Sequence, residues 1–268
     1  MSWVQALVLG ITQGLTEFIP VSSSGHLILV PWALGWTAML RDAEVTKTFD
    51  VALHMGTLLA VVVYFAPDLW RLRRQRRLLA LLIVATIPAG LFGVLLEDLF
   101  ERATQPWVIA VALTAFGVVM LVADRRGRKE REIDDLEMTD AVVVGAAQAL
   151  ALVPGVSRSG VTISAGIALR QSRETAARFS FLLSIPVITG AGLKKGVDLV
   201  SHGFPSTIGP GAFAIGIAAS AISGFAAVAL MLSYLRRGSL TVFVAYRWLA
   251  AAVVLVLIVS GARPATLA

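Results

Sequence analysis

Two short polar segments interrupt the long apolar stretches of this chain, and both carry residue types that suit phosphate chemistry. The first, residues 10–26, reads GITQGLTEFIPVSSSGH and contains a carboxylate, three serines and a histidine. The second, residues 145–161, reads GAAQALALVPGVSRSGV and places an arginine between two serines. A serine can act as a nucleophile, carboxylates and imidazoles move protons, and a guanidinium matches phosphate oxygens. The pattern therefore indicates chemistry on phosphate or diphosphate.

The two segments are copies of one another. Aligned without a gap at an offset of 135 positions, they share the identical pairs Gly10/Gly145, Gln13/Gln148, Leu15/Leu150, Val21/Val156, Ser22/Ser157, Ser24/Ser159 and Gly25/Gly160. The first copy alone has Glu17, Ser23 and His26, and the second alone has Arg158. Because an internal repeat brings equivalent elements together, we expect one site to which both copies contribute.

We predict that Glu17, Ser23, His26 and Arg158 form the catalytic group. Ser23 would attack phosphorus or position water, and His26 or Glu17 would take the proton; the sequence does not decide which residue becomes covalently modified. Half-helices that begin at each serine cluster would direct N–H groups and positive dipole ends toward the phosphate. The predicted phosphate-binding residues are Ser22, Ser24, Gly25, Ser157, Ser159 and Gly160.

Gln13 and Glu17 lie four positions apart and would share one helix face. Two oxygen donors on one face could hold Mg²⁺ or Ca²⁺ if substrate phosphates complete the coordination. Arg158 is the alternative partner that would offset the charge of Glu17. We therefore predict a divalent cation as a cofactor that depends on the substrate.

The composition places these segments in a lipid bilayer. The chain has 268 residues, of which 57% are hydrophobic and 15% charged, and its apolar stretches are long enough to cross a membrane. It contains no cysteine, so disulfides and thiolate metal sites are excluded. The net charge of +6 comes from arginines in short blocks between apolar runs, which argues against nucleic acid as a partner.

The apolar pattern predicts an all-α polytopic membrane protein with one integral membrane domain, residues 1–268. It divides into repeat 1 (1–123), a solvated charged linker (124–138) and repeat 2 (139–268). Each repeat would contain a re-entrant helical hairpin, too short to span the bilayer, followed by three transmembrane helices. The predicted hairpins are 3–18 with 23–36 and 139–152 with 158–170, and the predicted spans are 48–66, 79–97, 106–123, 174–192, 211–235 and 241–260.

Three crossings per repeat would invert the second copy relative to the first, so that the two hairpins enter from opposite sides. The basic blocks 71–77, 125–131 and 236–237 then lie on one face, which the positive-inside rule makes cytoplasmic. Both termini would be extracytoplasmic. Lys194 and Lys195 are exceptions to the rule, because they fall in a loop predicted to lie outside.

Several polar residues lie inside the predicted spans. We interpret His54 as a histidine that packs or supports another site residue, and we expect Glu174 and Arg178 to pair with each other across one helix turn. Arg247 lies inside the last span, where it could extend its charged end toward the membrane surface or pair with a carboxylate, and it is left unassigned. A stripe that could line the same cavity is formed by Lys47, Asp50, His54 and Thr57.

The motifs QGLTEFIPVSSSGH and PGVSRSG, together with KTFDVALHMGTLLAVVVYF and RFSFLLSIP, resemble the bacterial undecaprenyl-diphosphate phosphatases, the bacitracin-resistance family. The resemblance extends over essentially the whole chain. It implies a multi-pass enzyme of the bacterial inner (plasma) membrane, with a periplasm-facing pocket, that converts undecaprenyl diphosphate to undecaprenyl phosphate. It also implies that Ser23 is the nucleophile, and that Gln13 stands at the first position of an acidic metal motif.

Two questions stay open at this level. Inverted repeats with broken helices also occur in transporters, so a flippase for polyprenyl phosphate is the alternative to an enzyme. A purely structural scaffold does not explain the doubled polar segment. The sequence also leaves the oligomeric state open, with a homodimer among the states that it permits.

Overall fold

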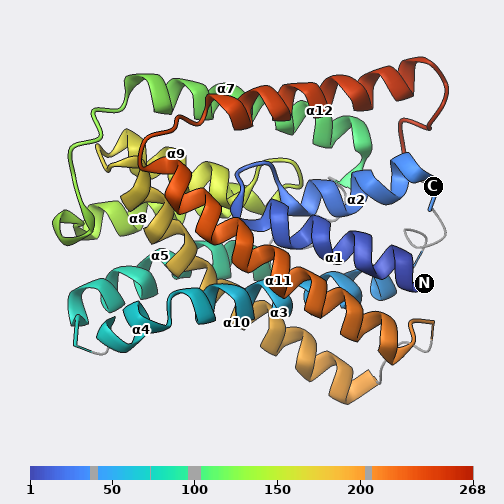
Figure 1. Ribbon diagram of the computed structural model, residues 1–268, viewed down its shortest axis with the longest axis horizontal. Helices are drawn as coiled ribbons and strands as arrows, with labels where there is room; N and C mark the ends of the chain where they lie inside the picture. The colour runs from blue at the N-terminus through green and yellow to red at the C-terminus, as the bar shows by residue number, and fades with distance from the viewer. Residues whose placement is uncertain (37–41, 73, 96–103, 203–206, 268) are drawn as a thin grey trace.

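Long apolar helices make up most of the molecule (Figure 1). The computed structural model describes residues 1–36, 42–72, 74–95, 104–202 and 207–267. Within these ranges there is no strand, and 6 helices are long and apolar enough to cross a membrane, as predicted. They are α3 (Ala43–Tyr64), α5 (Arg76–Leu95), α7 (Pro106–Arg126), α10 (Arg173–His202), α11 (Pro210–Leu235) and α12 (Thr241–Val259). The protein is thus an all-α polytopic membrane protein.

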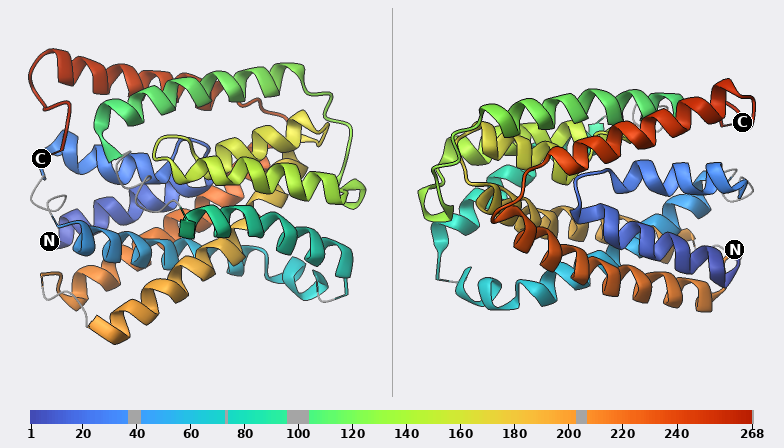
Figure 2. Two further views of the ribbon diagram at one scale, coloured as in Figure 1. Left: turned by 180° about the vertical axis from the view of Figure 1, so that it is seen from behind. Right: turned by 45° about the horizontal axis from the view of Figure 1, so that its top comes forward.

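Four shorter helices form the two predicted hairpins. The first hairpin consists of α1 (Trp3–Phe18) and α2 (Ser23–Leu34), and the second of α8 (Met138–Ala149) and α9 (Arg158–Ala168). A turn of 3₁₀ helix, η4 (Leu150–Leu152), extends α8. Figures 1 and 2 show the first hairpin toward the end of the molecule that holds both termini, and the second toward the opposite end.

Local sequence explains why each hairpin breaks where it does. Ser2 and Gln5 form a capping box that starts α1, and α1 ends at Ile19, whose extended backbone (φ −69°, ψ 132°) suits the residue before Pro20. Ser22 then caps α2 with φ 78°, and Ser157 caps α9 with the same φ. Two non-glycine residues with positive φ at equivalent positions carry backbone strain of the kind that proteins concentrate at functional sites.

Glycines let each hairpin pack closely on a spanning helix. α1 packs on α11, where a Cβ at Gly10 would lie 2.5 Å from the Gly216 carbonyl oxygen. α8 packs on α5, where a Cβ at Gly145 would lie 2.6 Å from the Ala85 carbonyl oxygen. The first helices of both hairpins are therefore held at fixed depth beside their neighbours.

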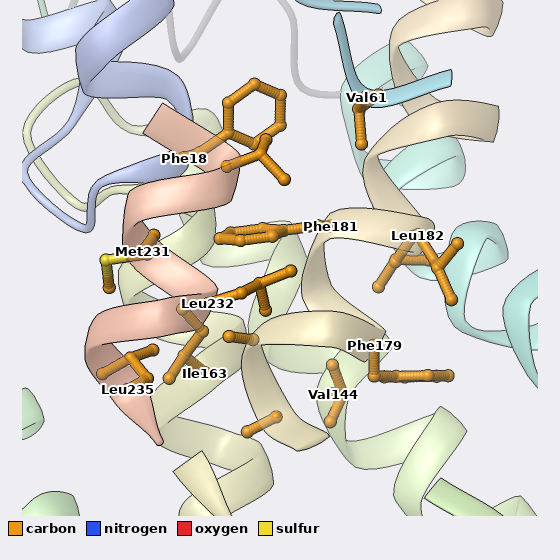
Figure 3. Packing of buried hydrophobic residues seen from close by; sticks show 14 of the residues in the cluster. Phe18, Val61, Val144, Ile163, Phe179, Phe181, Leu182, Met231, Leu232 and Leu235 are labelled. Carbon is orange, nitrogen blue, oxygen red and sulfur yellow. The ribbon is translucent and has the colours of Figure 1, made fainter. Parts of the chain in front are cut away.

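The main hydrophobic cluster fixes the inner end of α1 (Figure 3). Phe18 is fully buried and meets Phe181 of α10 edge-on, with ring centroids 5.3 Å apart. Val61 of α3 and Met231 of α11 belong to the same cluster. Because Phe18 follows Glu17 directly, this packing also fixes the position of the Glu17 carboxylate.

The charged segment 124–138 is largely exposed, as predicted, but it is anchored at both ends. Asp124 is buried and accepts hydrogen bonds from Arg173 Nε at 2.6 Å and from the Leu240 N–H at 3.1 Å. Arg131 binds both carboxylate oxygens of Asp140, at 3.0 and 2.8 Å. The segment therefore connects the start of α8 to the turns before α10 and α12.

Several details differ from the sequence-based prediction. Glu174 and Arg178 do not pair: Arg178 binds both oxygens of Asp68, at 2.8 and 2.7 Å, and Glu174 accepts from Arg236 at 3.2 Å. Asp68 lies in a short helix, α4 (Ala66–Leu72), that the sequence pattern had not indicated. It brings a carboxylate within reach of Arg178, and a bidentate pair is stronger than a contact within one helix.

Helix α10, the fourth of the predicted spans, is longer than predicted. α10 continues to His202 instead of ending near residue 192, because no proline follows Pro186 within it. Lys195 lies in this extension, where it is buried and pairs with Glu44 of α3. The contact gives this buried ammonium a charged partner, and Lys195 stays an exception to the positive-inside rule, which counts Lys and Arg and not net charge. The predicted outer loops at 97–105 and 193–210 lie in part outside the described residues.

Candidate active site

Glu17 is the centre of the candidate site. Its side chain is 5% exposed, and four side chains surround its carboxylate. Arg158 Nη2 donates to Oε1 at 2.7 Å, and Ser23 Oγ donates to Oε2 at 2.5 Å. Gln13 Nε2 also donates to Oε2, at 3.0 Å. The structure therefore brings together residues from both copies of the repeat, as expected for a shared site.

One guanidinium nitrogen of Arg158 is buried without a hydrogen-bond partner. Its Nη2 binds Glu17, whereas its Nη1 is buried without a hydrogen-bond partner. An unpaired buried donor is costly, and in a native protein it commonly marks a place where a ligand binds. A phosphate oxygen is the partner that suits a guanidinium best.

Ser23, Glu17 and Arg158 line a cavity of about 240 Å³. The polar part of its lining, which we call the floor, also includes Ser22, Ser24, Ser157, His54 and Gln148. The rest of the lining, the walls, is apolar and comes from α3, α5, α10 and η4. These residues are Val51, Ala89, Ala151, Leu152, Val187, Ile188 and Ala191. A polar floor under apolar walls suits a ligand with an anionic head and a hydrocarbon tail.

The other predicted phosphate-binding residues mostly support the serine caps. The Gly25 and Gly160 N–H groups donate to the Oγ atoms of Ser22 and Ser157, at 3.3 and 3.1 Å. Ser159 lies outside the cavity lining, with its Oγ 3.3 Å from that of Ser157. In the structure these three residues thus shape the two helix starts, and phosphate contact stays a prediction for them.

His26 does not line the cavity. Its Nδ1 lies 2.7 Å from the Ser22 carbonyl oxygen, and its Nε2 lies 2.8 Å from the Tyr246 hydroxyl. A carbonyl only accepts, so these partners assign the proton to Nδ1 and make Nε2 the acceptor of the Tyr246 proton. Both ring nitrogens are therefore engaged, Nδ1 by the cap of α2 and Nε2 by α12, and the structure does not bring His26 to the Glu17 carboxylate.

His54 takes the place beside Glu17 that the sequence suggested for His26. Its Nε2 lies 3.5 Å from Glu17 Oε2, and its Nδ1 lies 2.7 Å from the Asp50 carbonyl oxygen. It lines the cavity and lies beside Glu17, so of the two roles considered from the sequence its position fits the support of another site residue better than packing alone. The Asp50 side chain is not part of the lining. The polar stripe on α3 was the signal in the sequence that pointed to His54.

The residues around Glu17 fit a dedicated metal site poorly. In the described residues, no group of three or more His, Asp or Glu side chains is arranged to hold a metal ion. Gln13 points its amide nitrogen at Glu17, and Arg158 already balances the carboxylate charge. Ca²⁺ and Mg²⁺ require about six or more oxygen ligands, so most of them would have to come from substrate and water.

The chain was also compared with known proteins. A sequence model of the family described as bacitracin resistance protein BacA matches residues 6–253. Relatives named undecaprenyl-diphosphatase include one from Moorella thermoacetica, 47% identical over 95% of this chain and 97% of the relative. Another, from Geobacter metallireducens, is 45% identical over 96% of this chain and 99% of its own length. A third, from Rubrobacter xylanophilus, is 44% identical over 95% of this chain and 98% of its own length.

Proposed function

Because this chain belongs to the bacitracin resistance protein BacA family, we propose that it hydrolyses undecaprenyl diphosphate to undecaprenyl phosphate and inorganic phosphate. Relatives that cover nearly its whole length carry the name of that activity. The reaction returns a lipid carrier to cell-wall synthesis, and bacitracin resistance is its physiological consequence.

The observation that carries this proposal is the contact among Ser23, Glu17 and Arg158 at the floor of one cavity. A hydroxyl bonded to a carboxylate at 2.5 Å is a nucleophile beside its base. A guanidinium on the other carboxylate oxygen, with a free buried donor, is a group that can hold a phosphoryl oxygen. Positioning and charge stabilisation are most of what phosphoryl transfer requires of a protein.

The reaction then proceeds in two balanced steps. Ser23 Oγ attacks the terminal phosphorus, its proton passes to Glu17, and the P–O bond to undecaprenyl phosphate breaks. Glu17 gives this proton to the departing undecaprenyl phosphate and becomes a carboxylate again. Water next attacks the phosphoserine and passes one proton to Glu17. The P–Oγ bond then breaks to release inorganic phosphate, and Glu17 returns the proton to Ser23 Oγ. Arg158 and the first N–H groups of α2 and α9 stabilise the developing negative charge in both steps.

We propose a divalent cation only as a ligand that binds together with the substrate. Glu17 and Gln13 would offer it at most two protein ligands, and the diphosphate and water would supply the others. It would neutralise phosphate charge when bound. The proton transfers assigned to Ser23 and Glu17 do not depend on it.

The apolar cavity walls support a place for the prenyl chain. Ala89 of α5 and Val187, Ile188 and Ala191 of α10 lie along one side of the cavity. We propose that the chain leaves between these two helices into the lipid while the diphosphate stays at the polar floor. No polar group is needed along such a route, because the tail is as apolar as the surrounding bilayer.

We also propose that the halves form an inverted repeat in the inner membrane, with the pocket open to the periplasm. Contacts between elements support the repeat, because α1 on α11 has its equivalent in α8 on α5, and α7 on α9 in α12 on α2. The basic residues gather at the end of the molecule that holds α4 and residues 124–137. By the positive-inside rule that end is cytoplasmic.

A transporter for polyprenyl phosphate is the second function considered from the sequence. The names of the relatives do not favour it. A site for transport would need the arginine and the serine caps but no hydroxyl held against a carboxylate. Oligomeric state, including a homodimer, has no supporting observation beyond the sequence.

Phosphate release by purified protein in detergent tests the function, because detergent removes the two sides that transport requires. We expect the native chain to release phosphate, and Ser23→Ala and Arg158→Ala to lose at least about 10²-fold in kcat, as for loss of a nucleophile or of an electrostatic stabiliser. Rapid quenching with ³²P-labelled substrate should trap phosphoserine in the native chain only.

Ser223→Ala is the matched control, because this α11 serine bonds only backbone carbonyls, of Ala219 at 2.7 Å and Ile11 at 3.4 Å. It should keep kcat within about twofold, as expected for loss of such a contact away from reacting atoms. Full turnover by Ser23→Ala would overturn the serine mechanism. No phosphate release by native protein that still binds the lipid would favour transport.

A further inference from the structure

Arg247 is a fully buried cation that the proposed chemistry does not use. It lies in the first half of α12 and is 0% exposed. In the part of the chain that the structure describes, no carboxylate pairs with it. Burying an uncompensated guanidinium among apolar helices is expensive, so its contacts call for an explanation.

Its partners are backbone carbonyls in both polar loops. Nη1 donates to Pro20 at 3.3 Å, and Nη2 donates to Gly155 at 2.7 Å and to Val156 at 3.2 Å. Nε donates to the Leu113 carbonyl of α7 at 3.1 Å. One rigid planar group thus connects the α1–α2 loop, the η4–α9 loop and a spanning helix.

The two loop contacts fall at equivalent places. Pro20 and Gly155 are 135 positions apart, which is the offset of the repeat, and each precedes a strained serine cap by two residues. The loops also touch directly, because the Gly155 N–H donates to Ser22 Oγ at 3.0 Å. A single guanidinium therefore holds the two serine caps in a fixed relation to each other.

The residue before Arg247 adds a second contact from the same helix. Tyr246 bonds His26, whose other ring nitrogen bonds the Ser22 carbonyl. The first loop is thereby held from α12 at Pro20 and at Ser22. His26, predicted as a proton-transfer group, participates in this arrangement and is not part of the cavity lining.

We propose that Arg247 is a positioning residue that holds the α1–α2 and η4–α9 loops in register, so that Ser23 and Arg158 meet at Glu17. Ser23 and Arg158 are the first residues of α2 and α9. Each directly follows the serine cap of a loop that Arg247 binds. A shift of about 1 Å between the loops would misplace nucleophile and phosphate holder, and such errors cost about 10²-fold in rate. The proposal rests on the proposed hydrolysis for its activity readout.

The test compares Arg247→Met and Arg247→Lys with Arg178→Met as the matched control. Arg178 is also an arginine in a spanning helix, but its partner is Asp68 near the basic end. Each variant is purified as a monodisperse species, and kcat and KM are measured per folded molecule. Hydrogen–deuterium exchange of residues 19–24 and 153–158 is measured on the same samples.

We expect Arg247→Met to lose about 10²-fold in kcat with KM changed less than about threefold, because the tail still binds while the head group is misaligned. Arg247→Lys keeps the charge but not the planar fork, so its kcat should lie between those of Arg247→Met and the native chain. Exchange in both loops should rise in Arg247→Met. Arg178→Met should keep native kcat per folded molecule and native exchange in the loops.

Native kcat with unchanged exchange in folded Arg247→Met would overturn the proposal. Failure of the charge-preserving Arg247→Lys to fold would also overturn it, because Arg247 would then serve folding and not alignment. A native protein without phosphatase activity would contradict the proposed function alone. The exchange comparison would in that case still decide whether Arg247 holds the loops.

Discussion

The Glu17 carboxylate is surrounded by three hydrogen-bond donors and one histidine. Arg158 balances its charge, Ser23 and Gln13 donate to it, and His54 lies 3.5 Å from Oε2. When a diphosphate enters, Arg158 has to serve two anions. His54, whose Nδ1 proton faces the Asp50 carbonyl, would then have to carry a second proton on Nε2 to act as the cationic donor to this buried carboxylate.

His54 is therefore expected to matter for turnover. His54→Leu should lower kcat about tenfold, since a charge-assisted hydrogen bond contributes about 1.5–3 kcal/mol. His54→Gln keeps an N–H donor of similar reach and should lose much less. Steady-state kinetics in detergent measure both, and equal activities for Leu and native protein would show that His54 only packs.

The predicted cation can be tested without turnover. Because Glu17 and Gln13 supply too few ligands, we expect Mg²⁺ or Ca²⁺ alone to leave the thermal unfolding temperature unchanged. Pyrophosphate together with the cation should raise it more than pyrophosphate alone. A rise with the cation alone that Glu17→Gln abolishes would reveal a dedicated metal site and contradict this expectation.

At the scale of elements, each hairpin depends on close contact with one spanning helix. Gly10 against α11 and Gly145 against α5 leave no space for a Cβ, and the obstructing atoms are backbone carbonyl oxygens that cannot move aside. The depth of both broken segments is thus set by helix contact and not by the polar residues that they carry.

Gly145→Ala should consequently destabilise the protein by about 1–3 kcal/mol, the usual cost of overpacking. The matched control is Gly90→Ala on exposed α5 surface, where an added Cβ meets nothing within 4 Å and a helix gains from losing a glycine. Thermal unfolding in detergent should show a lower midpoint for the first variant and an equal or higher one for the second. The reverse order would mean that the hairpin contact is loose.

At the scale of the whole molecule, the distribution of charge gives the expected orientation. Arginines cluster at the end with α4 and residues 124–137, and Lys195 at the other end is paired with Glu44. The natural chain has no cysteine, so single introduced cysteines report on one position each. Ser2 and Arg128 are both exposed. Ser2 directly precedes α1 at the end of the molecule that holds the N-terminus, and Arg128 belongs to the segment between α7 and α8, which lies at the opposite end.

We expect Ser2→Cys to react with a membrane-impermeant maleimide in intact cells, and Arg128→Cys to react only after the cells are broken. The physical reason is the retention of basic residues on the cytoplasmic side. Mass shifts of the purified protein measure the labelling. The opposite pattern would reverse the orientation and place both termini in the cytoplasm.

The sequence by itself determined the elements and the main pair of the site. Broken helices followed from Pro20 and the serine clusters, because polar residues cannot interrupt an apolar span without a reason. The repeat then indicated that Glu17 and Arg158 would meet, and their side chains are 2.7 Å apart. These features can be predicted from the sequence because they depend on local composition and on the likeness of the two repeat copies.

Only the tertiary structure decided which neighbours the remaining polar residues have. His26 was the predicted proton-transfer group, but the histidine that lies beside Glu17 is His54, whereas His26 bonds Tyr246, 220 positions away. Arg178 binds Asp68, and Arg247 donates to backbone carbonyls in two loops. Spacing along a helix fixes only the face on which a side chain lies. Its partner depends on which other helix packs on that face, and the hydrophobic packing of distant segments sets that arrangement.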